Sequence, residues 1–230
     1  MLAVFDNDGT ICDTQEVEGR CFARAIAEVI GRSLPTTDWS AYEETTCAAI
    51  ARELLAGDRA ARTTEAAIER AFVRLLVAER PSFPGDFCPL RGAISFIQRL
   101  KADRICAVAI ATGCFAASAR FKLQCCGITL DDYPHATSSD TSRRSDIIRL
   151  SAARAGFDLS SVIYFGDAPW DVRASHVLGI PMIGIGRRWE HLRTLGIRHA
   201  FRDYTDADAI IRAMLELRAC DQSRDSKPAH

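Results

Sequence analysis

The sequence predicts an α/β protein with a Rossmann-like parallel sheet core and an inserted all-helical cap domain. Short, continuous apolar runs alternate with helical segments along most of the chain, and two of these runs end in acidic motifs. Continuous apolar runs are typical of parallel strands that are covered on both faces. Strands that alternate with helices indicate a parallel sheet with helices on both sides.

The core elements follow from these patterns. Strands are expected at residues 2–5, 105–111, 162–165 and 180–185. Helices are expected at residues 93–100, 115–126, 146–155, 171–178 and 207–219. The helix at 171–178 has a clear end, because Gly179 can adopt the left-handed cap and Pro181 cannot continue a helix.

Residues 15–85 depart from this alternation, because they contain no strand candidate. A helix is expected at 16–30, where apolar residues form one stripe. Two more helices are expected at 47–56 and 64–80. We therefore expect a helical cap domain at 15–85 and a catalytic core formed by 1–14 and 86–220. The polar residues 221–230 are expected to be a disordered tail.

Composition disfavours several classes of partner. The formal net charge of −1 gives no electrostatic attraction to nucleic acid or to an anionic membrane. No apolar run reaches the roughly 18 residues of a membrane span, and no secretory signal is recognisable. The nine cysteines contain no C-x-x-C pair and are expected to be reduced thiols. A cytoplasmic protein that acts on a small molecule is expected, and its oligomeric state stays open.

Four carboxylates follow predicted strands. Asp6 and Asp8 come after the first strand, and Asp167 and Asp171 come after the strand at 162–165. The carboxyl ends of parallel strands are where such sheets bind ligands. Acids gathered in a cleft repel one another unless a cation or a phosphoryl group lies among them. Mg²⁺ is the expected cation, because it prefers carboxylate, phosphate and water oxygens.

The first acidic pair suits phosphoryl transfer. Asp6 and Asp8 are two residues apart, which places both side chains on one side of an extended chain. Gly9 allows a sharp turn after them, and the Thr10 hydroxyl can form a local hydrogen bond. One carboxylate of such a pair can attack a phosphoryl group while the other moves protons.

These motifs, in this order, resemble those of the haloacid dehalogenase (HAD)-like hydrolases, in the branch of phosphoglycolate phosphatase and β-phosphoglucomutase with a helical cap. The likeness covers about residues 1–215. The first motif, D-x-D-G-T, matches residues 6–10; the second, an apolar strand that ends in Thr or Ser, matches 110–113; and the fourth, G-D-x-x-x-D, matches 166–171.

The resemblance implies a role for each matching residue. Asp6 would be the nucleophile and Asp8 the general acid and base. Thr112 and the backbone N–H of Gly113 would bind phosphate. Mg²⁺ would be held by the Asp6 carboxylate, the backbone carbonyl of Asp8, Asp167, and Asp171 directly or through water.

The third motif departs from the family pattern. The family has a lysine before this helix, but residues 141–148 contain none. Arg144 is the best placed substitute, with Arg143 as second choice. Arginine can pair with phosphate and with Asp6, although its planar fork differs from a point charge. The alternative is that both arginines belong to a solvated helix start.

The resemblance also narrows the reaction. Dehalogenases of this family lack the second aspartate, so the presence of Asp8 favours phosphoryl transfer. Phosphonoacetaldehyde hydrolases use a cap lysine, and residues 15–85 contain no lysine. The related mutases have a cap histidine near the position of Glu18, which makes mutase activity the less favoured alternative.

The sequence therefore predicts a magnesium-dependent phosphatase that hydrolyses a small soluble phosphate monoester through an aspartyl-phosphate. Arg20, Tyr42 and Arg52 are the cap residues that we expect to contact the substrate. A sugar phosphomutase on the same scaffold is one alternative. A binding or regulatory protein without turnover is another.

Overall fold

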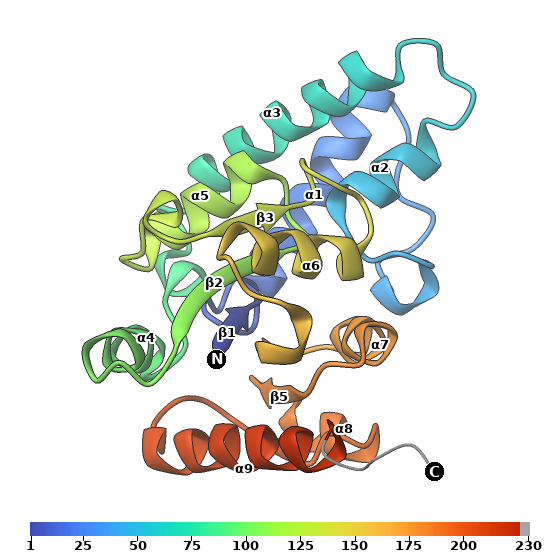
Figure 1. Cartoon of the computed structure of the whole chain (residues 1–230). Coiled ribbons are helices and arrows are strands. Elements are labelled where there is room, and N and C mark those ends of the chain that lie inside the picture. Colours follow the sequence, from blue (N-terminus) through green and yellow to red (C-terminus); the bar gives the residue numbers. More distant parts are fainter. Residues whose placement is uncertain (226–230) are drawn as a thin grey trace.

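A computed structural model gives the fold of residues 1–225, with side chains described through Ala219. Within this part the chain forms one six-stranded parallel sheet in the order β3-β2-β1-β4-β5-β6 (Figure 1). The strands are β1 (Leu2–Phe5), β2 (Ala107–Thr112), β3 (His135–Thr137), β4 (Val162–Gly166), β5 (Met182–Ile185) and β6 (His199–Phe201). The predicted α/β class and parallel sheet are confirmed.

Helices cover both faces of the sheet. The helices are α1 (Gln15–Ile30), α2 (Cys47–Leu54), α3 (Ala61–Glu79), α4 (Ala93–Ala102), α5 (Ala116–Cys125), α6 (Arg144–Arg154), α7 (Pro169–Leu178), α8 (Trp189–Thr194) and α9 (Ala207–Asp225). Helices α4, α5 and α9 contribute to the hydrophobic cluster on one face. Helices α6, α7 and α8 contribute to the cluster on the other. No described helix has both the length and the apolar character needed to cross a membrane.

The central strand β1 shows why the apolar runs are continuous. Ala3 and Phe5 belong to the cluster under α4 and α9, whereas Leu2 and Val4 belong to the cluster under α6 and α7. Successive side chains of a strand point to opposite faces, so burial on both faces requires an apolar residue at every position.

Helices α1, α2 and α3 gather at one end of the molecule (Figure 1). They share a separate hydrophobic cluster in which Phe22 of α1 packs edge-on against Phe72 of α3 at 5.5 Å between ring centroids. Phe115, just before α5, joins the same cluster. The Cys47 N–H, at the start of α2, donates to the Gly113 carbonyl at 2.8 Å and ties this end to the loop after β2.

The sequence-based expectations missed three short elements, namely β3, β6 and α8. Both missed strands are three residues long, begin with a histidine and form the edges of the sheet, so they lack the apolar run that marks a central strand. Helix α7 begins at Pro169 rather than at 171, because proline suits the first turn of a helix.

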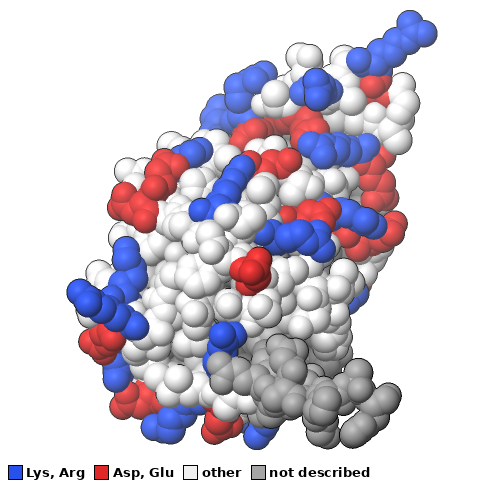
Figure 2. Space-filling view, in the orientation of Figure 1, with Lys and Arg blue, Asp and Glu red and all other residues white. Residues whose placement is uncertain are grey.

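The predicted disordered tail at 221–230 overlaps α9, which continues to Asp225 because no proline or glycine interrupts it. Residues 226–230 of that tail lie outside the described part of the chain. The eight cysteines with described side chains are all free thiols, as predicted. On the face shown in Figure 2, basic and acidic side chains are interspersed, as the net charge of −1 suggests.

Candidate active site

The acidic motifs meet where three neighbouring strands end. Asp6 directly follows β1, Asp167 directly follows β4, and Thr112 is the last residue of β2. The registers Phe5–Phe165 and Phe5–Ile110 bring these three strand ends to the same level. They line a cavity of about 870 Å³ that α1 and the start of α2 also border. This is the edge at which parallel sheets bind ligands.

Arg144 is the cation that faces Asp6. Its guanidinium, at the start of α6, lies 3.2 Å from Asp6 Oδ1 and 2.9 Å from Asp171 Oδ1. It also donates to the Thr45 carbonyl at 3.1 Å. Burial raises the pKa of Asp6 well above its usual range, and Asp171 and Asp8 add to this, while Arg144 opposes it. Arg144 thus occupies the place expected for the missing lysine.

Asp171 is fully engaged within the protein. Its Oδ1 accepts from the Tyr164 hydroxyl at 2.9 Å as well as from Arg144, and its Oδ2 accepts from the backbone N–H groups of Asp167 and Ala168, both at 3.1 Å. An acid in the first turn of α7 satisfies N–H groups that the helix leaves without partners. Of the two modes expected for Asp171, direct ligation of Mg²⁺ would have to break several of these bonds, whereas contact through water would not.

The remaining oxygen donors fit a hard cation. Ligand atoms of Asp6, Asp167 and Asp171 lie within 4.8 Å of one another. Burial raises the pKa of Asp167 well above normal, and Asp171 and Asp6 raise it further. Burial disfavours the charged form of both carboxylates, and each repels the other. A cation between them would stabilise both. The Asp6 and Asp167 carboxylates are therefore the side chains best suited to hold Mg²⁺.

The second aspartate is held by an unexpected lysine. The Lys122 ammonium lies 2.6 and 2.7 Å from the two oxygens of Asp8. The Thr14 hydroxyl donates to Asp8 Oδ1, and the Cys114 thiol donates to Asp8 Oδ2 at 2.9 Å. Burial alone would raise the pKa of Asp8, but Lys122 and these hydrogen bonds lower it. Asp8 is therefore a carboxylate in this arrangement.

Glu18 completes this group. Its Oε1 lies 3.1 Å from the Lys122 ammonium and 2.7 Å from the Cys114 sulfur, whose single proton is shared between Glu18 and Asp8. Burial, with repulsion from Asp8, raises the pKa of Glu18 from 4.5 to about 7. Burial would lower the pKa of Lys122, yet Asp8, Cys114 and Glu18 raise it well above normal. Lys122 thus stays an ammonium and cannot act as an amine nucleophile.

The second motif forms one side of the cavity. Thr112 and Gly113 both line it, and the Cys114 N–H donates to the Thr112 hydroxyl oxygen at 3.2 Å. A β-carbon at Gly113 would clash with the Arg144 guanidinium and would lie 3.1 Å from the Thr45 carbonyl. Glycine is therefore the residue that lets Arg144 approach this loop.

Some residues that the sequence suggested for the site lie apart from the cavity or are already paired. Arg20 lines the cavity, but its guanidinium pairs with Asp86 at 3.1 Å. Arg143 is 67% exposed and pairs with Glu44 at 3.7 Å, outside the cavity lining. Thr10 is fully buried, and its hydroxyl has no partner among the described residues.

The other two predicted cap contacts also lie outside the cavity lining. The Tyr42 hydroxyl donates to the Thr36 carbonyl at 3.0 Å, and the residue is buried. Arg52 forms two hydrogen bonds with Glu65, at 2.9 and 3.0 Å. Cap helices expose many polar side chains, so residue type alone could not identify the ones that face the cavity.

Sequence reasoning missed Lys122 as a residue of the site. A signal existed, because Lys122 shares one face of α5 with Ser118, Ala119 and Leu123, all buried. A charged residue on a buried helical face requires a partner. The lysine considered at the sequence level would have come from residues 15–85, whereas Lys122 reaches the site from α5.

Comparisons with known proteins identify the family of this chain. The family model described as "haloacid dehalogenase-like hydrolase" matches residues 1–179. No curated protein matches the sequence.

Solved structures share the fold. A β-phosphoglucomutase from Clostridium difficile has a TM-score of 0.70 at 15% identity, with 95% of this chain and 96% of that chain covered. CbbY from Rhodobacter sphaeroides, a mutant in complex with xylulose-(1,5)bisphosphate, has a TM-score of 0.69 at 18% identity, with 89% and 95% covered. A hydrolase from Pseudomonas syringae has a TM-score of 0.66 at 19% identity, with 94% and 99% covered. With its motifs gathered at the strand ends and a family match over residues 1–179, the chain belongs to the haloacid dehalogenase-like hydrolases.

Proposed function

We propose that this protein is a magnesium-dependent phosphatase that hydrolyses a small soluble phosphate monoester through an aspartyl-phosphate on Asp6. The main support is the position of Asp6, which lies at a strand end within one cavity beside Arg144, Thr112 and Asp167. Phosphoryl transfer depends mostly on positioning and on charge neutralisation, and these residues supply both.

In the first step, an Asp6 oxygen attacks the phosphorus atom and the bond between phosphorus and the ester oxygen breaks. Asp8 gives the departing alkoxide the proton that it took from water in the second step of the preceding turnover, and the alkoxide leaves as an alcohol. Arg144 and the N–H of Gly113 stabilise charge on the phosphoryl oxygens. Bound Mg²⁺ would neutralise further negative charge on Asp6 and on the phosphoryl group.

In the second step, Asp8 takes a proton from a water molecule, and the water oxygen attacks the phosphorus atom. Inorganic phosphate leaves and the Asp6 carboxylate is restored. Lys122 lowers the pKa of Asp8 against the effect of burial, so Asp8 is ionised and able to accept this proton. We further propose that α1, α2 and α3 act as a cap that excludes bulk water during both steps.

The experiment is release of inorganic phosphate from a panel of phosphate esters, measured with Mg²⁺ and with EDTA, beside the Asp6→Asn variant. We expect turnover that requires Mg²⁺ and that Asp6→Asn abolishes. Full activity of a folded Asp6→Asn variant would refute the proposal.

We place the reaction in the cytoplasm, because the free thiols suit a reducing compartment.

A sugar phosphomutase is the second candidate. Glu18 of α1 lines the cavity beside Asp8, so a titratable group faces the site from the helical end of the molecule. A mutase would isomerise a sugar phosphate faster than it releases free phosphate. Product analysis of sugar phosphates by NMR, run beside the phosphate assay, separates the two reactions.

A further inference from the structure

Lys122 lies outside every motif that the proposed function uses. It is located in α5, its side chain is 0% exposed, and its ammonium reaches a carboxylate of the first motif. A fully buried lysine is rare unless it is paired. Such pairs are weak evidence for stability, because an apolar residue of similar size is often equally stable.

The polar contacts of this ammonium all lie at the site. It lies within 2.7 Å of both Asp8 oxygens, 3.0 Å from the Cys114 sulfur and 3.1 Å from Glu18 Oε1. It also lies 6.0 Å from the ring centroid of Phe72 in α3. Lys122 therefore joins the loop after β1, the loop after β2 and two helices of the proposed cap.

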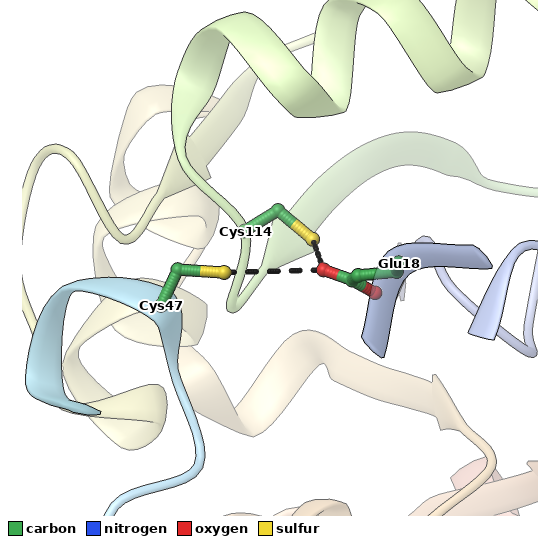
Figure 3. Close-up of side chains that lie close together, drawn as sticks. All are labelled: Glu18, Cys47 and Cys114. Carbon is green, nitrogen blue, oxygen red and sulfur yellow. Dashed lines mark hydrogen bonds between the residues drawn. The ribbon is translucent and has the colours of Figure 1, made fainter. Parts of the chain in front are cut away.

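The neighbouring thiols do not form a separate metal site. Glu18, Cys47 and Cys114 point toward one another, with ligand-type atoms within 4.8 Å (Figure 3). The Lys122 ammonium already lies beside the Glu18 carboxylate and the Cys114 sulfur. The Lys122 ammonium thus supplies the positive charge that Glu18 and the two thiols would otherwise draw from a metal ion.

We propose that Lys122 is a positioning residue that binds both oxygens of Asp8 and orients this carboxyl group for proton transfer to the departing alkoxide. The proposal rests on the phosphatase function proposed above. Among the described side chains, Lys122 alone donates to both oxygens of Asp8, whereas Asn7, Thr14 and Cys114 each contact one of them. The Thr14 hydroxyl and the Cys114 thiol then complete its fixed environment.

Two esters distinguish positioning from a structural role. An alkyl phosphate has a poor leaving group that needs a proton, whereas p-nitrophenyl phosphate has a leaving group that hardly needs one. In Lys122→Met, we expect kcat/KM to fall by about tenfold to 100-fold for the alkyl ester and by less than about threefold for p-nitrophenyl phosphate. Lys122→Arg, which keeps the charge, should restore part of the kcat/KM for the alkyl ester. Lys101→Met, on the exposed side of α4, is the matched control.

If Lys122→Met fails to fold, the double variant Lys122→Met/Glu18→Gln removes the ammonium together with one carboxylate. It should fold and show the same selective loss for the alkyl ester. An equal loss for both esters would overturn the positioning role while leaving the phosphatase function intact.

Thermal unfolding tests the contact without any substrate. Lys122→Met should lower Tm in the parent protein and lower it much less in an Asp8→Asn background. If the parent hydrolyses no ester, the proposed function fails. The comparison of Tm values in the two backgrounds still measures the interaction between Lys122 and Asp8. Equal Tm changes in both backgrounds would show that Lys122 and Asp8 do not interact, and the proposal would be refuted.

Discussion

The raised pKa of Glu18 predicts a defined dependence of stability on pH. Burial favours the neutral form of this carboxyl, so its pKa rises from 4.5 to about 7 in the folded protein. A group with a raised folded pKa contributes stability that is fully present below the unfolded pKa and is lost as pH rises through the folded pKa. The protein should therefore lose stability between about pH 4.5 and 7 through this one group.

The magnitude follows from the same two values. At about 1.4 kcal/mol per pH unit, the rise from 4.5 to about 7 gives an upper limit of about 3.5 kcal/mol. Because 18% of the Glu18 side chain is exposed to water, we expect about 2 kcal/mol. For a chain of this size that amounts to about 4–8 °C in Tm.

The assay compares Tm of the parent and of Glu18→Gln from pH 4.5 to 8 in buffer with EDTA. Glutamine cannot ionise, so the variant should gain stability relative to the parent as pH rises, and the gain should level off above about pH 7. Glu43→Gln, at an exposed position, is the control and should show a constant difference. If the Tm difference between Glu18→Gln and the parent is also constant over this pH range, the raised pKa of Glu18 is refuted.

Three further predictions concern Arg144 and the residues that contact it. Arg144→Met removes the cation beside Asp6 and should lower kcat by about 10²–10³ in steady-state assays, whereas the exposed neighbour Arg143→Met should change it by less than about threefold. Equal effects would contradict the assignment of Arg144. Gly113→Ala places a methyl group against Arg144 and should lower kcat/KM by about tenfold or more, while Gly85→Ala, whose added β-carbon would meet nothing within 4 Å, should not. Asp171→Asn breaks a buried ion pair and should cost about 3 kcal/mol of unfolding free energy by denaturant titration; a loss below about 1 kcal/mol would show that this pair is not structural.

The fold was predictable where burial imposes a simple pattern. Strands β1, β2, β4 and β5 are covered on both faces, so each is an apolar run that the sequence reveals. The edge strands β3 and β6 are short and begin with a histidine, and local sequence carries little trace of them. Their pairing is decided by the neighbouring strand rather than by their own residues.

The site was predictable where a motif fixes a residue at a strand end. Asp6, Thr112 and Asp167 lie together because the strands that carry them are neighbours. Arg144 could be chosen over Arg143 only by its position, and the structure shows that only Arg144 turns inward. Lys122 and Glu18 could not be connected to Asp8 from spacing, because their contact depends on how α5 and α1 pack.

The central claim is that Asp6 carries the phosphoryl group during turnover. The most direct measurement is rapid mixing of the Mg²⁺-loaded protein with a substrate ester, followed by acid quench, borohydride reduction and mass spectrometry of the peptides. Borohydride reduces an aspartyl-phosphate, so we predict a modified residue at Asp6 that Asp6→Asn lacks. Steady phosphate release with an unmodified Asp6 peptide, or with the modification on another residue, would contradict the account.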